Sequence, residues 1–301
     1  MGRYQPPFLE AQEKMTAVAR QLHSFSQGFP PLGETIMAKP LVSDALWQRI
    51  EPLLPTAKPR RFRFPGRRPL DYRKILTGIV FVLKTGIDWD DLPAELGWGC
   101  GKTCKNTLKT WQAAGIWEQL HHLLLEELQE ADQIDWSHGA VDSTKARAMG
   151  GGDDTGPNPT DRSKLGTKHH VLTDAQGIPL ATTVTGANEP DVKQLLPLVD
   201  GIPDLSGPQG DKQTKPDELY ADRAYDSEPH RQELRDRDID PKIAKRRTEH
   251  GSGLGIYRWV VERTNAWLHS FGKLRLRTDP DGVIHKALVS LGSALICMWF
   301  L

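Results

Sequence analysis

Residues 140–144, Ala-Val-Asp-Ser-Thr, place the carboxylate of Asp142 in the middle of a strand-like run over residues 138–148. Burying a charge is costly unless the group is paired or bound to a metal ion. An acid inside a strand of a central sheet therefore indicates a ligand site. The alternative is an aspartate at a strand end that bonds to the backbone.

A second acid, Asp222, ends another strand-like run over residues 218–222. The carboxyl ends of strands are where open α/β sheets gather ligands. If the two strands are neighbours, they lie about 4.8 Å apart, and their carboxylates are close enough to share hard divalent cations. The surrounding pattern is a hairpin (168–173 and 178–185), a helix (191–199), a strand (241–244) and a helix (257–270). This order predicts a mixed α/β domain with helices on the faces of a sheet.

The helix over residues 257–270 carries Arg258 and Glu262 one turn apart on a single stripe. Such a pair forms an ordinary ion pair worth about 0.3 to 0.5 kcal/mol when exposed. From the spacing alone, Arg258 and Glu262 can be a simple ion pair or can have a functional role, and both interpretations stay open.

The first half of the chain has helical periodicity, with predicted helices over residues 43–54, 70–84, 102–114 and 116–130. A glycine-bounded turn over residues 97–101 precedes the third of these. That third helix separates an apolar side from an exposed stripe of Lys102, Lys105, Asn106 and Lys109. Helix, turn and a helix with a basic stripe predict a helix-turn-helix-like DNA-binding domain, with an ordinary solvated surface as the alternative.

Basic residues also cluster locally. The segment over residues 58–74 holds eight basic residues against one acid, Asp71, and is interleaved with phenylalanine and proline. Contact with phosphates explains this accumulation of one sign of charge better than a solvated loop does. The predicted phosphate contacts are Arg60, Arg61, Arg63, Arg67 and Arg68, joined by Lys245, Arg246 and Arg247 just before the Glu262 helix.

The overall charge gives no such argument, because Lys plus Arg and Asp plus Glu number 39 each. Three cysteines without the paired spacing of a zinc or redox motif fit a reducing cytosol. The longest apolar stretch is shorter than a membrane span requires. We therefore expect a cytoplasmic protein without membrane contact, built as a loosely ordered leader (1–40), a helical DNA-binding domain (41–133) and a catalytic domain (134–301).

From about residue 39 to the end, the sequence resembles the insertion-sequence transposases of the DDE class, closest to the insertion-sequence-5 family within the IS4/IS5 group. The resemblance rests on three motifs: residues 140–144, residues 220–227 (Tyr-Ala-Asp-Arg-Ala-Tyr-Asp-Ser) and residues 257–264 (Tyr-Arg-Trp-Val-Val-Glu-Arg-Thr). It implies a ribonuclease-H-like core in which Asp142, Asp222 and Glu262 are catalytic and bind two Mg²⁺ ions, with Mn²⁺ as a substitute.

The resemblance also assigns Arg258 a DNA-phosphate contact. The related pattern has a tyrosine and a lysine where this chain holds Gly255 and His269, although Tyr257 and Lys273 stand nearby. The implied activity is a DNA transposase that binds terminal inverted repeats, cleaves at the element ends and transfers the 3′ hydroxyl to target DNA. The implied partners are double-stranded DNA of ends and target and a second copy in the DNA complex, with the protein on the nucleoid when bound.

Two other functions share these residues. A catalytically silent, element-derived DNA-binding regulator would use only the helical region and the basic segments. A metal-dependent nuclease without strand transfer would use the same acids and differ only in the fate of the freed hydroxyl.

Overall fold

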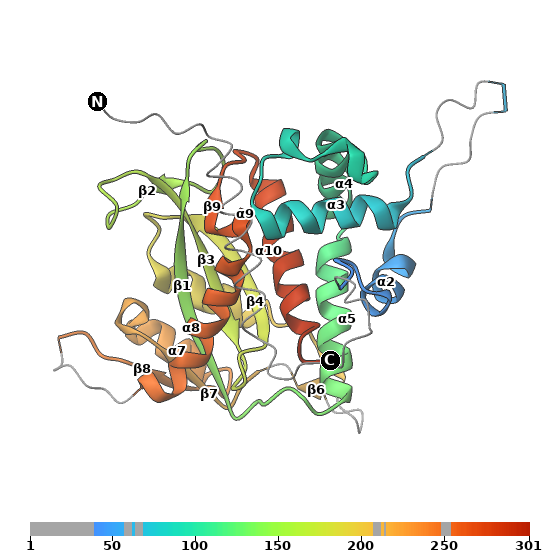
Figure 1. Ribbon diagram of the computed structural model, residues 1–301. Helices are drawn as coiled ribbons and strands as arrows, with labels where there is room; N and C mark the ends of the chain where they lie inside the picture. The colour runs from blue at the N-terminus through green and yellow to red at the C-terminus, as the bar shows by residue number, and fades with distance from the viewer. Residues whose placement is uncertain (1–38, 57–61, 64–68, 207–211, 214, 248–253) are drawn as a thin grey trace, which may run out of the picture. The chain divides into compact units, whose positions relative to one another are not determined.

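A computed structural model describes residues 39–56, 62–63, 69–206, 212–213, 215–247 and 254–301 (Figure 1). The predicted leader lies outside the described residues except for Lys39 and Pro40. Residues Leu41–Leu301 form one compact unit.

Four helices form the first part of this unit, close to where the hydrophobic periodicity predicts them. The first, α2 (Asp44–Ile50), begins at Ser43, whose hydroxyl accepts a hydrogen bond from the Leu46 amide at 3.1 Å. This is the expected N-cap. After the 3-10 turn η1 (Glu51–Leu53) follow α3 (Tyr72–Thr85), α4 (Gly101–Ala113) and α5 (Ile116–Glu130).

The connection between α3 and α4 differs from a short helix-turn-helix turn. It begins at Gly86, whose φ of 78° lies in the left-handed region that ends helices. It then makes the 3-10 turns η2 (Trp89–Asp91) and η3 (Ala94–Leu96) before α4 starts. This path over residues 86–100 is longer than the turn of about three or four residues in that motif.

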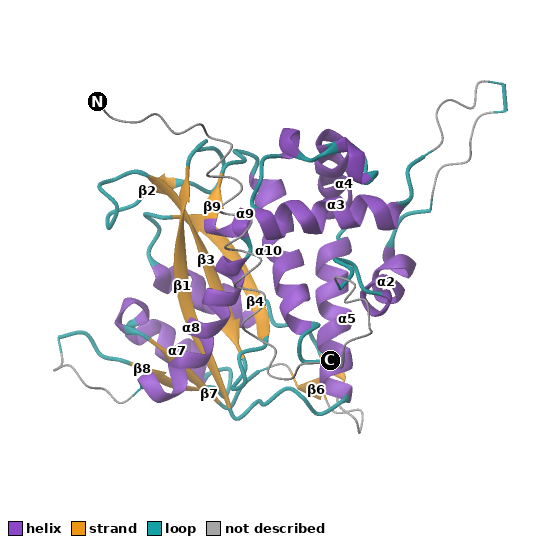
Figure 2. Ribbon diagram, in the orientation of Figure 1, coloured by secondary structure: helices purple, strands orange, loops and turns teal. Residues whose placement is uncertain are grey.

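The rest of the unit is built on a mixed sheet (Figure 2). Its first three strands are antiparallel, and two more run parallel to the first, in the order β4-β3-β1-β7-β8. These strands are β1 (His138–Ala148), β3 (Leu165–Thr173), β4 (Pro179–Gly186), β7 (Glu218–Ala221) and β8 (Asp240–Ile243).

Short strands and helices complete the sheet region. Two short strands extend the sheet: β2 (Gly156–Pro157) pairs with β3, and β9 (Leu276–Arg277) pairs with β1. A separate two-stranded sheet joins β5 (Leu205–Ser206) and β6 (Lys212–Gln213). The helices are η4 (Asp191–Gln194), α6 (Leu195–Asp200), η5 (Arg223–Tyr225), α7 (Glu228–Arg235), α8 (Gly255–Ser270), α9 (Gly272–Arg275) and α10 (Gly282–Cys297).

Alternation along β1 shows which elements cover which face of the sheet. Asp142 accepts a hydrogen bond from Asn265 of α8, whereas its neighbour Ser143 donates one to Asp191 of η4. Successive side chains of a strand point to opposite faces. Therefore α8 lies on one face, and η4 with the following α6 lies on the other.

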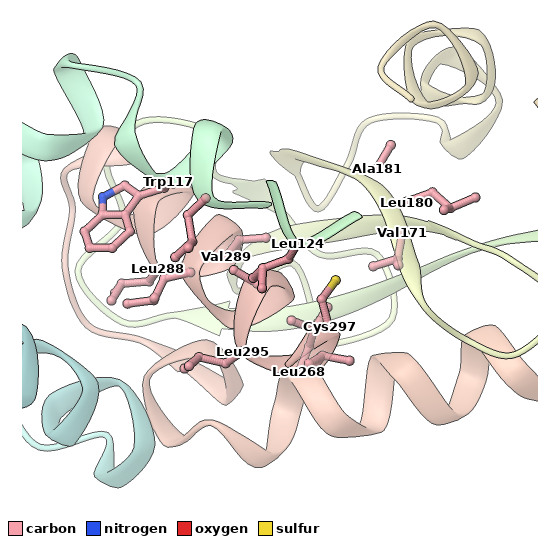
Figure 3. Close-up of a cluster of buried hydrophobic side chains, with 14 of the residues drawn as sticks. Trp117, Leu124, Val171, Leu180, Ala181, Leu268, Leu288, Val289, Leu295 and Cys297 are labelled. Atoms are coloured by element: carbon pink, nitrogen blue, oxygen red, sulfur yellow. The ribbon is translucent and has the colours of Figure 1, made fainter. Parts of the chain in front are cut away.

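Helix α10 joins the helical region to the sheet region. It packs against α4 and α5 on one side and against α8 and β4 on the other. Figure 3 shows the result, with Trp117 and Leu124 of α5 in the same cluster as Leu288 of α10 and Val171 of β3. The chain passes from α5 to β1 over residues 131–137, near the predicted boundary, but the two parts share one hydrophobic core.

The structure describes the state of the cysteines and the lengths of the helices. All three cysteines, Cys100, Cys104 and Cys297, are free thiols. Within the described ranges, no helix has both the length and the apolar character needed to cross a bilayer.

The shared core predicts how the chain unfolds. We expect Leu288→Ala, which leaves a cavity between the helical and sheet regions, to lower the free energy of unfolding by about 2 to 5 kcal/mol. Circular dichroism and tryptophan fluorescence should still report one coincident urea transition. Val283→Ala, on the exposed side of the same helix, is the matched control and should change stability by less than about 0.5 kcal/mol. Two separate transitions, only one of them shifted, would contradict the shared core.

Candidate active site

Strand register brings the first two acids side by side. In the parallel pair of β1 and β7, Ala140 lies opposite Tyr220. Asp142 and Asp222 each follow two residues later, so both carboxylates stand at the same level on adjacent strands. Asp222 comes just after β7 and caps η5 by accepting a hydrogen bond from the Ala224 amide at 2.8 Å. The carboxyl end of β7 is thus where the two acids meet.

Helix α8 brings the third acid to this place. The Asn265 amide donates a hydrogen bond to Asp142 Oδ2 at 3.2 Å, which fixes α8 above β1. The Arg258 guanidinium nitrogen Nη2 lies 3.8 Å from Asp142 Oδ1 and 3.6 Å from Glu262 Oε1. Arg258 and Glu262 therefore do form the ion pair that their spacing allows, and the same guanidinium also reaches Asp142.

Burial separates the roles of these side chains. Asp142 and Arg258 expose only 21% and 19% of their side chains, whereas Glu262 exposes 58%. Glu262 is consequently free to change rotamer, while Asp142 is held by its strand and by Asn265.

The acids influence one another electrostatically. Burial, the largest cause, raises the pKa of Asp142 from 3.8 to about 6, and the negative charges of Asp222 and Glu262 raise it further. A backbone hydrogen bond and the Arg258 charge act in the opposite direction. Because burial and like charge outweigh Arg258, an additional cation near Asp142 would be favourable.

The donor chemistry of the three acids fits a divalent cation, since Mg²⁺ prefers carboxylate oxygens. In the described part of the chain, however, no three His, Cys, Asp or Glu side chains stand in an arrangement that could hold a metal ion. The guanidinium of Arg258 lies near both Asp142 and Glu262 and supplies a positive charge there.

The predicted DNA-contacting residues of α4 divide into two groups. Lys102 and Asn106 are exposed. In contrast, Lys105 pairs with the buried Asp279 at 2.7 Å, and Lys109 pairs with Asp281 at 2.6 Å. These two lysines tie α4 to the segment that leads into α10, so their charges are shared with the sheet region.

The other predicted contacts lie at loops. Arg63 is exposed, whereas Arg60, Arg61, Arg67 and Arg68 lie outside the described residues. Before α8, Lys245, Arg246 and Arg247 are exposed. The Arg246 guanidinium donates to the carbonyls of Arg223 and Ala224, at 2.9 and 3.0 Å, which links this loop to the turn after Asp222.

In the related pattern a tyrosine and a lysine stand where this chain has Gly255 and His269. The nearby Tyr257 and Lys273, and His269 itself, make the following contacts. Tyr257 stacks on Tyr220 with ring centroids 4.4 Å apart. Lys273 is buried and donates to Asp88 and Thr278, both at 2.8 Å. The His269 ring packs against His169, 5.6 Å between centroids. Lys273 is therefore committed to a contact with the loop after α3.

Neighbouring histidines of β3 point to opposite faces, as strand geometry predicts. His169 Nε2 lies 2.7 Å from His285 Nε2 of α10, and His170 Nε2 lies 2.8 Å from Thr185 Oγ1. They do not face a common ion.

Several polar side chains near the acids were not predicted. Asn265 completes the stripe of Arg258 and Glu262 at helical spacing, so the periodicity of α8 could have identified it. Asp191 is different, because it reaches Ser143 only through the fold. Its sequence context, after Pro190, indicated only the start of a helix.

Comparison with known proteins shows the family to which the chain belongs. Residues 135–296, more than half of the chain, match the family described as transposase DDE domain. The chain therefore belongs to the DDE transposases, the class that the resemblance indicated. Residues 42–121 match the family described as putative transposase of IS4/5 family, which places it among the insertion-sequence transposases.

The chain is also similar to three curated relatives, two of which are named as transposases. A putative transposase for insertion sequence element IS402 from Burkholderia cepacia is 62% identical over 48% of this chain and 68% of its own length. An insertion element IS402 uncharacterized 16.2 kDa protein from the same organism is 58% identical over 41% of this chain and 84% of its own. A transposase for insertion sequence element IS1106 from Neisseria meningitidis serogroup B is 32% identical over 35% of this chain and 36% of its own.

The raised pKa of Asp142 gives a prediction about stability. The folded-state pKa of about 6 exceeds the ordinary 3.8, so the folded state is relatively favoured below about pH 4 and loses this contribution as the pH rises through 6. Asp142→Asn should therefore unfold at higher urea than the parent chain at pH 8 in chelator, by on the order of 2 kcal/mol. At pH 4 the two should coincide.

Glu262→Gln is the matched control, because the exposed Glu262 should affect stability little at either pH. An Asp142→Asn variant that is less stable than the parent at pH 8 would show that the pair with Arg258 outweighs burial and like charge.

Proposed function

We propose that this transposase cleaves DNA at the ends of its insertion sequence and transfers the freed 3′ hydroxyl to target DNA. The observation that carries the proposal is the placement of Asp142 and Asp222 abreast on β1 and β7, with Glu262 joined to Asp142 through Arg258. The names of the IS402 and IS1106 relatives describe transposases and support the same activity.

We also propose that the sheet region is a ribonuclease-H-like core. The support is its mixed sheet, in which an antiparallel set of three strands is followed by two strands parallel to β1. In this arrangement the first acid lies within the first long strand and the second follows the parallel strand beside it.

In this proposal Asp142, Asp222 and Glu262 hold two Mg²⁺ ions, for which Mn²⁺ substitutes. Two such ions supply activation of the attacking oxygen and stabilisation of the leaving oxygen at the phosphate. The role of Asp142 is to provide a carboxylate fixed by β1 and Asn265. The role of Glu262 is to turn inward from its exposed position, and Arg258, released from the acids, contacts a DNA phosphate.

DNA would be held by basic residues outside the acids. We propose that Lys102 and Asn106 of α4 contact the DNA backbone, together with Lys245, Arg246, Arg247 and the five predicted arginines Arg60, Arg61, Arg63, Arg67 and Arg68. Lys105 and Lys109 could reach DNA only at the expense of their ion pairs. The partners are double-stranded element ends and target, a second copy of the chain assembles in the complex, and the protein acts in the cytoplasm on nucleoid DNA.

The catalytic assignment predicts the loss of cleavage when an acid is neutralised. Asp222→Asn keeps an oxygen to cap η5, and Glu262→Gln changes an exposed side chain, so both should fold. Each should lower Mg²⁺-dependent cleavage of a duplex carrying the element end by on the order of 10³-fold, because several kcal/mol of transition-state stabilisation disappear. Asp236→Asn, at an exposed acid at the end of α7, is the control and should cleave normally.

The same assay separates the competing functions. Joined donor and target strands indicate transposition, and cleaved products that never join indicate a nuclease. A parent chain that binds the end in a gel shift but does not cut it would favour the silent regulator and sink the proposal.

Because Lys102 of α4 is exposed whereas Lys105 is ion-paired with Asp279, replacing each lysine should have a different effect. Lys102→Ala should weaken binding to all DNA sequences and reduce the slope of log Kd against log salt concentration by about 1, while leaving the melting temperature unchanged. Lys105→Ala should instead lower the melting temperature, because it leaves the buried Asp279 unpaired. Filter binding across a salt series and thermal unfolding measure both. An unchanged salt slope for Lys102→Ala would remove α4 from the proposed DNA surface.

A further inference from the structure

The carboxyl-terminal end of β1 carries basic side chains that lie outside the predicted DNA contacts. Lys145 stands opposite Lys168 of β3, and Arg147 stands opposite Gly166. Residues paired across a ladder point to the same face of a sheet, as do residues two apart on one strand. Lys145, Lys168 and Arg147 therefore project from one face, and Gly166 adds no side chain beside Arg147.

The charges of these three side chains are matched unequally. Lys168 Nζ pairs with Asp191 Oδ1 at 2.9 Å. Lys145 Nζ instead donates to the uncharged Thr160 Oγ1 at 3.2 Å, and Arg147 is exposed. Among the described residues, no carboxylate forms an ion pair with Lys145 or Arg147. Two positive charges at this end of β1 are thus left without a partner of opposite sign.

The loop between β2 and β3 adds two further cations. Arg162 and Lys164 are exposed, and neither forms an ion pair in the part of the chain that the structure describes. Lys164 precedes Gly166 by two residues, so the loop ends beside Arg147. The loop itself holds one acid, Asp161. The four cations are called the β1 basic patch below: Lys145, Arg147, Arg162 and Lys164.

The loop is closed by its own hydrogen bonds in a conformation that side chains disfavour. Arg162 and Ser163 have φ values of 49° and 58°, in the left-handed region. The Ser163 amide donates to the Asn158 carbonyl at 3.0 Å, and the Asn158 amide donates to the Lys164 carbonyl at 2.8 Å. Asn158 Oδ1 accepts from the amide and hydroxyl of Thr160, at 3.1 and 2.9 Å. Such strain gathers where a segment contacts a ligand.

The acids that precede the loop do not neutralise the patch. Asp154 pairs with Lys286 of α10 at 2.8 Å. Asp153 Oδ2 accepts a hydrogen bond from the Gly282 amide, at the start of the same helix, at 3.4 Å. Both carboxylates are thus directed toward α10, and the patch keeps its positive charge.

Strand β1 links the patch to the candidate active site. Arg147 stands five residues beyond Asp142 on this strand, about 16 Å at the usual rise per residue. Strand β7 pairs with the first residues of β1, whereas β2 and its loop adjoin the last ones (Figure 1). Duplex DNA rises about 3.4 Å per base pair. A duplex with its scissile phosphate at the acids therefore reaches the patch within about half a helical turn.

We propose that the β1 basic patch contacts the DNA backbone on one side of the scissile phosphate, chiefly through Arg147, Arg162 and Lys164. The inference rests on the proposed function, because it extends the DNA surface of the same enzyme. DNA phosphates fit the patch because cations without carboxylate partners, held on a strand and a closed loop, match a regular row of negative charges. Contacts of this kind fix the register of the duplex without reading its sequence.

The test removes charge from the patch and, as a control, from a matched pair of arginines elsewhere. Arg147→Gln combined with Lys164→Gln should reduce the slope of log Kd against log salt concentration by about 2, measured by filter binding of a random-sequence duplex in chelator. The melting temperature should not change, because neither side chain has an ion pair among the described residues. Arg235→Gln combined with Arg237→Gln removes the same charge where both arginines pair with acids, and should keep the parent's slope.

A single substitution gives the same test with little risk to folding. Asparagine adopts the left-handed conformation more readily than arginine does. Arg162→Asn should therefore lower the salt slope by about 1 without lowering the melting temperature.

The outcomes distinguish failure of this inference from failure of the proposed function. If the parent binds the duplex and the patch variants keep its salt slope, the patch is not a DNA contact and the proposed function stands. An equal fall in the slope of the Arg235→Gln, Arg237→Gln control would show that net charge alone sets the slope, which also overturns the inference. If the parent does not bind the duplex, the proposed function fails, and the inference fails with it.

Discussion

Repulsion between carboxylates at the carboxyl end of β7 is the constraint on which the site depends. Asp142 is largely buried, Asp222 stands beside it on the next strand, and Glu262 approaches from α8. Arg258 lies between two of the acids and lowers the pKa of Asp142, but burial, the largest cause, still raises that pKa to about 6. A protein selected only for stability would not keep such an arrangement, so the unfavourable charge is best understood as a readiness to bind cations.

The position of Glu262 relative to the strands depends on packing far from the acids. Asn265 and the apolar side of α8 hold this helix against β1. Helix α10 packs against α8 and also contacts α4 and α5. The ion pairs of Lys105 and Lys109 with the segment before α10 add a polar connection between the same parts. The helical region was expected to bind DNA as a separate domain. Through these contacts it also supports α8, the helix that carries Glu262.

Much of this arrangement could be predicted from local pattern. The extent of β1, the hairpin of β3 and β4, and the Ser43 cap follow from alternation, turn residues and capping preferences. The three acids were recognisable by motif. Long-range pairing was not, because the ion pair between Lys105 and Asp279 joins residues whose neighbourhoods carry no mutual signal. In the connection between α3 and α4 the glycine turn over residues 97–101 could be predicted from the sequence, whereas the pattern did not identify η2 and η3 as 3-10 turns.

Arg258 joins the electrostatics of the acids to the proposed binding of DNA. If Arg258 moved out to contact a phosphate, its positive charge would no longer lie between Asp142 and Glu262. Cations that take over the charge of the acids would free Arg258 for DNA, and a phosphate that draws Arg258 away would leave the acids short of positive charge. Under the proposed function, thermodynamic linkage then requires that divalent cations and DNA each strengthen the binding of the other. Under the same proposal, the contacts of Arg258 seen in the structure would occupy Asp142 and Glu262 until both cation and DNA are present.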